Sequence, residues 1–232
     1  MDEVKDVETI KEKSAPPPVT KQRLRVTFTR DATLKYIGHL DMSLTWQRIL
    51  RRAGLPLAYS EGFNPQPRIT FAAALPVGCI SDYEMMDVVL ETTLDVNAAK
   101  AQLDRAVPPG IRIMSITEVP LHSAALQAQL QASEYEITLG ATDAIERAID
   151  RVKVFVEASE VMRDRRGKVY NLRPLVQTLT IETEAYRTVI RSRLQATEGG
   201  TGRPDELLLA LGLDPAIAQI KRTQLVFLDK TI

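Results

Sequence analysis

The stretch "LRVTFTRDATLKYIGHLDMSLTWQRILRRAG", residues 24–54, changes its hydrophobic period once along its length. In its first part Leu24, Val26 and Phe28 alternate with polar residues, which is the period of a half-buried β-strand. In its second part apolar residues recur at helical spacing, at Met42, Trp46, Ile49, Leu50 and Ala53. Gly54 then gives a helix C-terminal signal. The stretch therefore predicts a strand followed by an amphipathic helix.

The residues that follow continue this alternation of strand and helix. Two strands are predicted from "RITFAAAL" (68–75) and "YEMMDVVLE" (83–91). A second helix is predicted from "NAAKAQLDRAV" (97–107), which prolines and a glycine stop, and a fourth strand from "IRIMSITEV" (111–119). The order βαββαβ predicts a ferredoxin-like unit.

A similar order begins again further along the chain. The predicted elements are a strand at 134–140, a helix that Asp143 caps, a hairpin at 160–172 around Arg166-Gly167, a strand at 186–194, a helix at 203–212 and a strand at 220–228. We therefore expect an α+β chain of tandem ferredoxin-like units, each an antiparallel sheet with helices on one face. The expected division is a flexible tail at 1–20, units at 21–120 and 134–232, and a linker or short helix at 121–133.

Charge is balanced over the whole chain but segregated within it. Thirty basic and thirty acidic residues give a formal net charge of zero. Residues 21–68 nevertheless hold nine Lys or Arg against three Asp or Glu, whereas residues 82–95 hold five acidic residues and no basic one. The total charge gives no argument for nucleic-acid binding, so the distribution must decide. The acidic strand is a possible interface.

Several chemistries are disfavoured by what the sequence lacks. Its single cysteine allows no internal disulfide and no iron–sulfur cluster on its own thiolates, and its two histidines have no zinc spacing. Phosphate-loop, dinucleotide and nucleophile-elbow motifs are missing. No apolar run approaches a membrane span, and no secretory signal is evident. We expect a cytoplasmic protein that binds no metal, cofactor or membrane by itself.

The first half carries candidate binding residues around the loop "YSEGFNPQPR", residues 59–68. Gly62 and Asn64 permit unusual backbone angles and two prolines then fix the path, so a stiff loop is predicted. A preordered loop suits recognition, although turn chemistry alone is the alternative. The candidates for partner or ligand binding are His39, Asp41, Arg48, Arg52, Tyr59, Ser60, Glu61, Asn64, Arg68 and, further on, Arg173. Asp41 and His39 can also serve only the helix start, and the two helical arginines can line a solvated face.

A second set of candidates is basic and is suited to nucleic acid. The candidates for RNA binding are Arg23 and Arg25 on the first strand and Arg163, Arg165, Arg166 and Lys168 at the hairpin tip. Arginine forks onto phosphate, and such arrays can follow a backbone. The alternative is a solubilising surface, since charges also blunt exposed strand edges.

Three blocks of this sequence resemble a bacterial family usually called radical SAM-linked proteins. The blocks are "LRVTFTR" followed by "GHLD", then "RRAGLPLAYSEGFNPQPRITFAAALPVG", and later "RRGKVYNLRPLV". The resemblance implies a domain of unknown function that is fused to, or encoded beside, a radical S-adenosylmethionine protein, near genes for ribonucleases or ribosomal proteins. It therefore implies a protein partner and a link to RNA metabolism, but no reaction.

The resemblance also carries over onto particular positions. These are His39, Asp41, Arg52, Tyr59, Ser60, Gly62, Asn64, Pro65 and Pro67 in the first half, and Asn171, Leu172, Arg173 and Pro174 in the second. Family members commonly have Asp where Asn171 stands and His where Gln66 stands. Because an amide exchanges no proton near neutral pH, those departures weaken a catalytic role for either position here.

Three hypotheses about function follow. The first is an accessory module that docks with a radical SAM enzyme and helps to present an RNA or ribosomal substrate. The second is a stand-alone RNA-binding protein. The third is an RNA-modifying enzyme that uses His39, Asp41 and Glu61 for acid–base chemistry. The sequence leaves enzymatic activity open, assigns no catalytic residue, and favours a non-catalytic partner.

Overall fold

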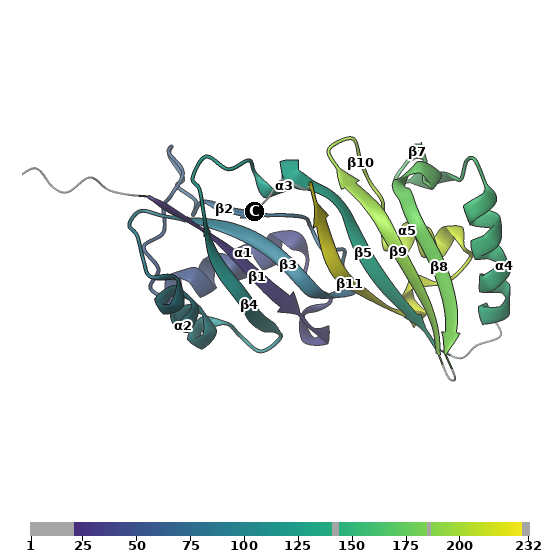
Figure 1. Ribbon diagram of the computed structural model, residues 1–232, viewed down its shortest axis with the longest axis horizontal. Helices are drawn as coiled ribbons and strands as arrows, with labels where there is room; N and C mark the ends of the chain where they lie inside the picture. Colours follow the sequence, from purple (N-terminus) through teal and green to yellow (C-terminus); the bar gives the residue numbers. More distant parts are fainter. Residues whose placement is uncertain (1–20, 141–143, 185–186, 229–232) are drawn as a thin grey trace, which may run out of the picture.

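A computed structural model describes residues 21–140, 144–184 and 187–228 (Figure 1). They form an α+β fold with one nine-stranded, mostly antiparallel sheet, a separate two-stranded hairpin, and helices. The predicted tail at 1–20 and the predicted cap Asp143 lie outside the described residues.

The first half contains four strands and two long helices. Its elements are β1 (Gln22–Arg30), the 3-10 helix η1 (Ala32–Leu34), α1 (His39–Arg52), β2 (Ile69–Phe71), β3 (Cys79–Leu90), α2 (Val96–Ala106) and β4 (Ile111–Val119). In this half β1 lies between β4 and β3, and β2 pairs with the other edge of β3. The change of period within residues 24–54 thus places β1 and α1 as predicted.

The second half has more elements. They are α3 (Leu126–Gln129), β5 (Leu130–Leu139), α4 (Ala144–Glu157), β6 (Met162–Arg165), β7 (Lys168–Asn171), η2 (Arg173–Leu175), β8 (Val176–Glu184), β9 (Arg187–Thr197), β10 (Gly200–Thr201), α5 (Pro204–Ala210), η3 (Pro215–Ile217) and β11 (Ala218–Phe227). Residues 121–133, predicted to be a linker or short helix, contain α3 and the first residues of β5.

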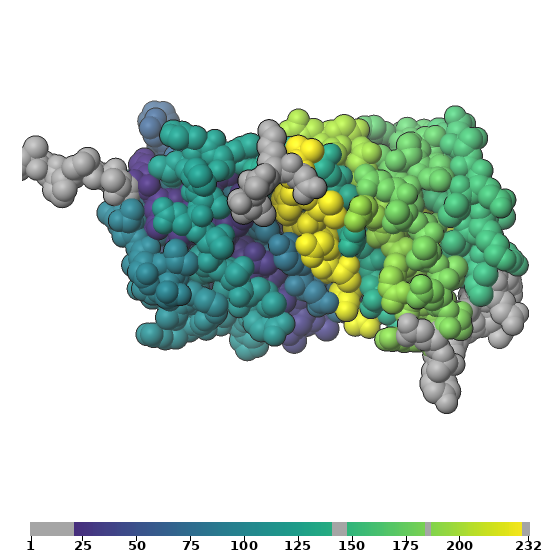
Figure 2. All heavy atoms as spheres, in the orientation of Figure 1, coloured from purple at the N-terminus to yellow at the C-terminus, as the bar shows by residue number. Residues whose placement is uncertain are grey.

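The two halves share one sheet instead of forming two separate ones. β11 pairs antiparallel with β5 and, at Ile220–Arg222, parallel with Cys79–Ser81 of β3. The resulting order along the sheet is β10-β9-β5-β11-β3-β1-β4. Figure 2 shows β11, in yellow, between the purple and blue first half and the green second half. The C-terminal strand therefore joins the halves.

Three apolar clusters stabilise this arrangement. The first packs α1 and α2 on one face of β1, β3 and β4, with the ring of Phe28 edge-on to Trp46 at a centroid distance of 4.7 Å. The second packs α4 and α5 against β5, β9 and β11. The third, on the other face, includes the fully buried Leu126 of α3. Burial of these apolar side chains is the main driving force for folding.

The predicted strand at 68–75 is reduced to three residues. β2 pairs with Met86–Val88, whereas the Cys79–Ser81 end of the same β3 edge is occupied by β11. Residues beyond Phe71 therefore leave the ladder, with the Ala72 amide still donating to the Met85 carbonyl at 2.9 Å. A long-range pairing that no local pattern shows shortened the strand.

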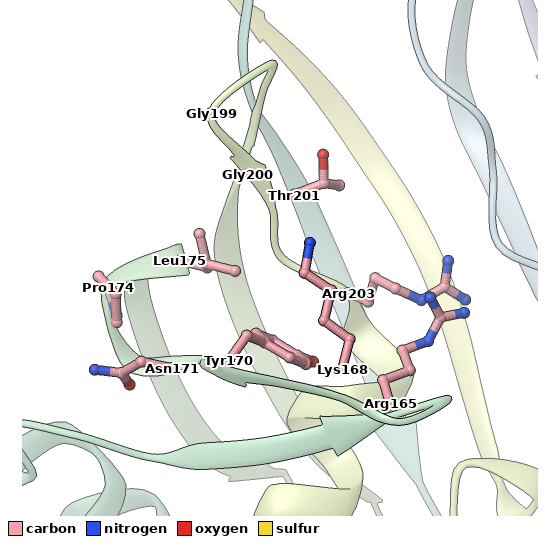
Figure 3. Close-up of a pocket in the computed structure, with 10 residues that line it drawn as sticks. All are labelled: Arg165, Lys168, Tyr170, Asn171, Pro174, Leu175, Gly199, Gly200, Thr201 and Arg203. Carbon is pink, nitrogen blue, oxygen red and sulfur yellow. The ribbon is translucent and has the colours of Figure 1, made fainter.

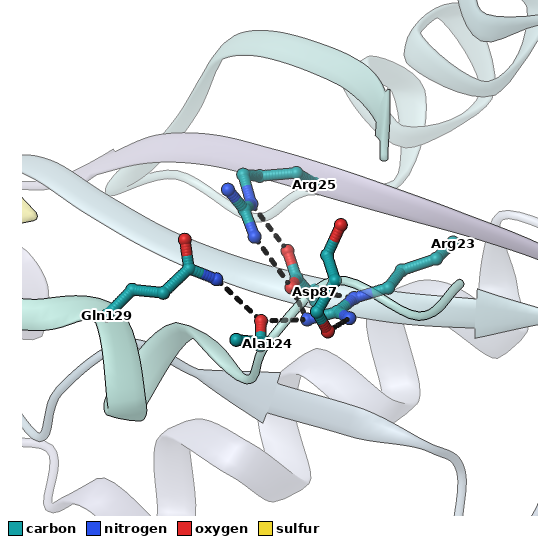
Figure 4. A network of polar contacts seen from close by, with 6 residues as sticks. Arg23, Arg25, Asp87, Ala124 and Gln129 are labelled. Carbon is teal, nitrogen blue, oxygen red and sulfur yellow. Dashed lines mark hydrogen bonds and ion pairs between the residues drawn. The ribbon is translucent and has the colours of Figure 1, made fainter. Parts of the chain in front are cut away.

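The opposite charges that are separated in the sequence meet within the sheet. Arg23 and Arg25 of β1 both bind Asp87 of β3, and the arrangement is shown in Figure 4. Further pairs join β3 to its neighbours: Arg222 with Glu84, Lys221 with Asp82, and Lys21 with Glu91. The acidic segment is therefore neutralised within the molecule. The RNA-binding candidates Arg23 and Arg25 of β1 are therefore not free, because Asp87 on the adjacent strand pairs with both.

None of the helices in the described part of the chain is long and apolar enough to cross a membrane. The same described residues contain no group of three or more His, Cys, Asp or Glu side chains placed to hold a metal ion.

Candidate functional site

The hairpin β6–β7 projects basic side chains beside the end of the sheet. Its turn residues Arg166 and Gly167 both have positive φ, 56° and 77°, as a two-residue type I′ turn requires. The side chain of Asp164 fixes the turn by accepting a hydrogen bond from the Gly167 amide at 2.9 Å. The predicted hairpin is confirmed, and its turn places Arg165 and Lys168 opposite each other at the ends of the two strands.

Glu206 anchors this hairpin to α5. It lies in the first turn of that helix, where Pro204 takes the first position and the helix dipole favours a negative charge. Its buried carboxylate pairs with Arg163 at 3.3 Å and with Arg165 at 3.5 Å. One carboxylate thus orients two arginines. Burial, and next the charge of Glu206, raises the pKa of the nearby Tyr170 hydroxyl, which stays protonated as a donor.

A cavity of about 480 Å³ lies between the hairpin and the turn before α5 (Figure 3). Its walls include the three cations Arg165, Lys168 and Arg203 together with Tyr170 and Thr201. In the figure Lys168 extends from β7 toward β10, and the Arg165 and Arg203 side chains extend to the same side of the cavity. We call it the basic cavity.

The ion pairs leave positive charge in the basic cavity. Arg203 is held by Asp205 through two hydrogen bonds of 3.0 Å, and Arg165 shares Glu206 with Arg163. Lys168 is exposed and forms no ion pair with the described residues. Cations therefore outnumber carboxylates there. A ligand with an anionic oxygen would find one free ammonium and two oriented guanidiniums.

A second cavity, of about 360 Å³, adjoins the first and shares Thr201 and Arg203 with it. It lies where the halves meet, and its lining includes His39, Tyr135 and the buried Arg222. We call it the junction cavity. Partial burial lowers the pKa of the His39 imidazole. The charge of Glu84 opposes this shift, whereas the charges of Arg30 and Arg222 lower the pKa further. The imidazole is therefore neutral near pH 7.

The predicted loop is exposed and braced by its own contacts. The Ser60 amide donates to the Gln66 carbonyl, the Gln66 amide donates to Ser60 Oγ at 3.0 Å, and Gln66 Nε2 donates to Asn64 Oδ1 at 3.1 Å. The predicted stiffness thus has a structural basis. Neither the basic cavity nor the junction cavity includes the loop residues Tyr59, Ser60, Glu61 and Asn64. Arg68 lies instead with Arg23 at a smaller cavity of about 340 Å³.

The remaining candidates of the first half are dispersed. Of these, His39 alone lines the junction cavity. Asp41 is exposed and does not cap α1, whose N-cap is Gly38; Thr45 Oγ1 donates to the Asp41 carbonyl at 2.8 Å. Arg48 is exposed, and Arg52 donates to the Ala106 carbonyl, linking α1 to α2. The structure does not bring these side chains together into one site.

Three further basic candidates also have structural partners. Arg173 donates to the carbonyls of Val176 and Val156 and lies 5.8 Å from the centre of the Phe155 ring. Arg23 is buried against Asp87 and also donates to the Ser123 carbonyl at 2.7 Å. Arg25 donates to both carboxylate oxygens of Asp87, as Figure 4 shows. Their charges are used inside the fold.

Sequence reasoning missed part of the basic cavity. Arg203, Thr201 and Tyr170 line it, and Glu206 orients its arginines. Arg203 stands directly before the proline that begins α5, and Glu206 lies in the first turn of that helix. Polar residues at a helix start were a signal, but their proximity to the hairpin depends on the tertiary fold.

The chain belongs to a bacterial family that is described as an uncharacterized protein conserved in bacteria (DUF2344), whose model matches residues 23–204. A comparison with the curated proteins found no match. The family assignment therefore brings no established reaction.

Solved structures similar to this chain include a Cbf5-Nop10-Gar1 complex, at 14% identity and a TM-score of 0.45 over 88% of this chain and 50% of that one. An archaeal box H/ACA sRNP Nop10-Cbf5 complex has 15% identity and a TM-score of 0.39 over 88% and 49%. An unknown protein from Galdieria sulphuraria has 14% identity and a TM-score of 0.27 over 89% and 99%. The chain spans about half the length of the first two.

Proposed function

We propose that this protein is a non-catalytic RNA-binding module whose basic cavity holds a phosphate group of the RNA backbone. The observation that carries the proposal is the placement of the unpaired Lys168 beside Arg165 and Arg203 around one cavity. Phosphate contacts from lysine and arginine supply most of the affinity in protein–nucleic acid complexes. The ion pairs to Glu206 and Asp205 hold the guanidiniums in place before the ligand arrives.

The surroundings of the cavity favour a polymer over a small anion. The exposed Arg166 stands at the tip of the same hairpin, outside the cavity, and has no ion pair within the described residues. A cation outside the cavity can contact the next phosphate group along an RNA chain. It cannot contact a single phosphate ion that is bound inside the cavity. The bacterial family that the chain resembles, with its link to RNA metabolism, supports the same ligand.

We further propose that the module serves a radical SAM enzyme that acts on an RNA or ribosomal substrate. The observation that favours docking is Phe63, whose side chain is fully exposed at the braced loop after α1. An exposed aromatic residue on a rigid loop is a typical anchor at a protein interface. The basic cavity, on the other half of the fold, would remain open to RNA.

The acid–base hypothesis receives less support. Asp41 and Glu61 are exposed, and no hydrogen bond or ion pair joins His39, Asp41 and Glu61 among the described residues. A general acid and base must reach a common substrate position.

We also infer that the two halves are ferredoxin-like units fused along β3 and β11, since strand order β8-β9-β5-β11 matches that of β2-β3-β1-β4.

RNA binding tests the first proposal. Fluorescence anisotropy with a short labelled RNA is expected to show a loss of affinity of at least about tenfold in Lys168→Glu, because the charge reversal repels a phosphate. Lys153→Glu is the matched control, since Lys153 is also exposed but lies on α4. Equal affinities for both variants and the unmodified protein contradict the proposal.

Affinity capture tests the second proposal. The tagged protein is expected to retain an iron–sulfur protein of the radical SAM class, and Phe63→Ser is expected to lose it. Leu209→Ser, which alters an exposed apolar residue of α5, is the control and should retain the partner. If both variants still capture the partner, or if both lose it, docking through the loop is contradicted.

A further inference from the structure

The junction cavity and the basic cavity share lining residues but differ in chemistry. Their common wall is made by Thr201 and Arg203. The volumes, about 480 and 360 Å³, both fall within the roughly 300–1,000 Å³ of small-ligand sites. A ligand that fills both must therefore have two parts joined over this wall.

The walls of the junction cavity suit a flat, weakly polar group. Small and apolar residues form much of the lining, namely Ala72, Ala73, Ala74, Pro76, Leu130 and Ala196. Short side chains leave width between the walls, and the hydroxyl-bearing Ser133 and Thr197 add hydrogen-bonding groups. A planar heterocycle with edge donors and acceptors matches this lining.

The floor of the junction cavity is fixed by a buried ion pair. Arg222 donates to Glu84 Oε1 at 2.9 and 2.6 Å, so its charge is neutralised in place. Its third nitrogen donates to the Ala74 carbonyl at 3.3 Å, which holds the alanine wall. The cavity therefore offers a preformed shape and not a free cation, unlike the basic cavity.

His39 completes the lining of the junction cavity. Its ring lies edge-on to Phe71 at a centroid distance of 5.4 Å, which restrains its orientation. His39 is only partly buried, so its ring remains accessible to a ligand in the cavity. An aromatic ring of this kind can stack on a nucleobase.

We propose that the two cavities bind one unpaired nucleotide, with the phosphate in the basic cavity and the base in the junction cavity. This inference rests on the proposed RNA binding and adds that the RNA is single-stranded at the site. A base within a duplex is stacked and paired, so it cannot enter a separate cavity unless it leaves the helix. Thr201 and Arg203 would lie against the sugar that connects the two parts.

Filling the junction cavity tests the inference separately from RNA binding itself. Ala74→Leu and Gln127→Trp alter exposed lining residues, and Ala128→Leu alters an exposed alanine of α3 outside the lining. Titration calorimetry would compare nucleoside monophosphates, nucleosides and inorganic phosphate. The first two variants are expected to bind a monophosphate at least about fivefold more weakly, as expected for loss of one base contact. The affinity for inorganic phosphate should be the same in all variants. Ala128→Leu should bind the monophosphate as tightly as the unmodified protein does.

The same variants would be titrated with a single-stranded RNA and a duplex of equal length. Preference for the single strand that disappears in Ala74→Leu supports the inference. Equal monophosphate affinity in the filled and unmodified proteins overturns it, as does tighter binding of a phosphoserine peptide than of any nucleotide. If RNA affinity then still depends on Lys168, the proposed function stands without the base-binding site.

Discussion

Arg222 on β11 and Glu84 on β3 form a buried ion pair with three hydrogen bonds at the place where the two halves of the sheet meet. Burial alone would lower the pKa of Arg222, but the interactions with Glu84 and Tyr135 together outweigh it and raise the pKa, so the guanidinium stays ionised. The pair lies beneath the junction cavity, so its geometry matters to both the fold and the proposed ligand site.

Removing one partner of this pair should destabilise the protein strongly. Glu84→Gln leaves a buried guanidinium without its countercharge, and we expect a loss of about 3–5 kcal/mol in the free energy of unfolding. Urea denaturation followed by circular dichroism measures it. The control is Asp104→Asn, which breaks the exposed Lys100–Asp104 pair on α2 and should cost less than about 1 kcal/mol. A similar small loss for both variants would show that the buried pair is dispensable.

The only cysteine should report on opening of the same junction. Cys79 is buried on β3 opposite Ile220 of β11, and burial raises the pKa of its thiol to about 12. At about pH 8 the thiolate is therefore scarce as well as inaccessible, and thiolate is the reactive form. We expect an Ellman-type reagent to label the folded protein only at the rate of unfolding. Rapid labelling in the absence of denaturant would contradict the paired β3–β11 junction.

His39 should titrate below the value of a free histidine, which is about 6.5. Because the folded state disfavours the proton, the unfolded chain binds more protons as pH falls through that value, so acidification destabilises the fold. The contribution is present above the unfolded pKa and is lost as pH falls toward the folded pKa. NMR titration of the imidazole in a His122→Gln background measures it. A His39 pKa at or above 6.5 would contradict partial burial at the junction cavity.

Local sequence signals predicted most elements of this fold. Alternation predicted β1 and helical spacing predicted α1. The helix predicted at 203–212 corresponds to α5, which ends at Ala210, and Gly212 follows with a positive φ of 66°. The hairpin turn was predicted around Gly167, because glycine tolerates a positive φ, and Arg166 before it also adopts one. These features depend on neighbours within a few positions, so the sequence alone carries them.

What the sequence could not predict depends on distant contacts. Arg23 alternates with apolar residues like an outward cation, yet it is buried because it reaches diagonally across to Asp87 of β3, which stands opposite Arg25. The parallel pairing of β11 with β3 joins segments more than a hundred residues apart, which shortens β2 and creates the junction cavity. The hairpin cations were candidates from the outset, but Arg203 became one only through the tertiary fold.

The salt dependence of RNA affinity reports directly on whether a phosphate group binds in the basic cavity. Dissociation constants of a short single-stranded RNA would be measured over a series of salt concentrations for the unmodified protein, Lys168→Ala and the control Lys153→Ala. We predict that Lys168→Ala weakens binding and makes the slope of log affinity against log salt shallower by about 1, the value for one lost phosphate contact. The same slope in all three proteins would show that Lys168 contacts no phosphate.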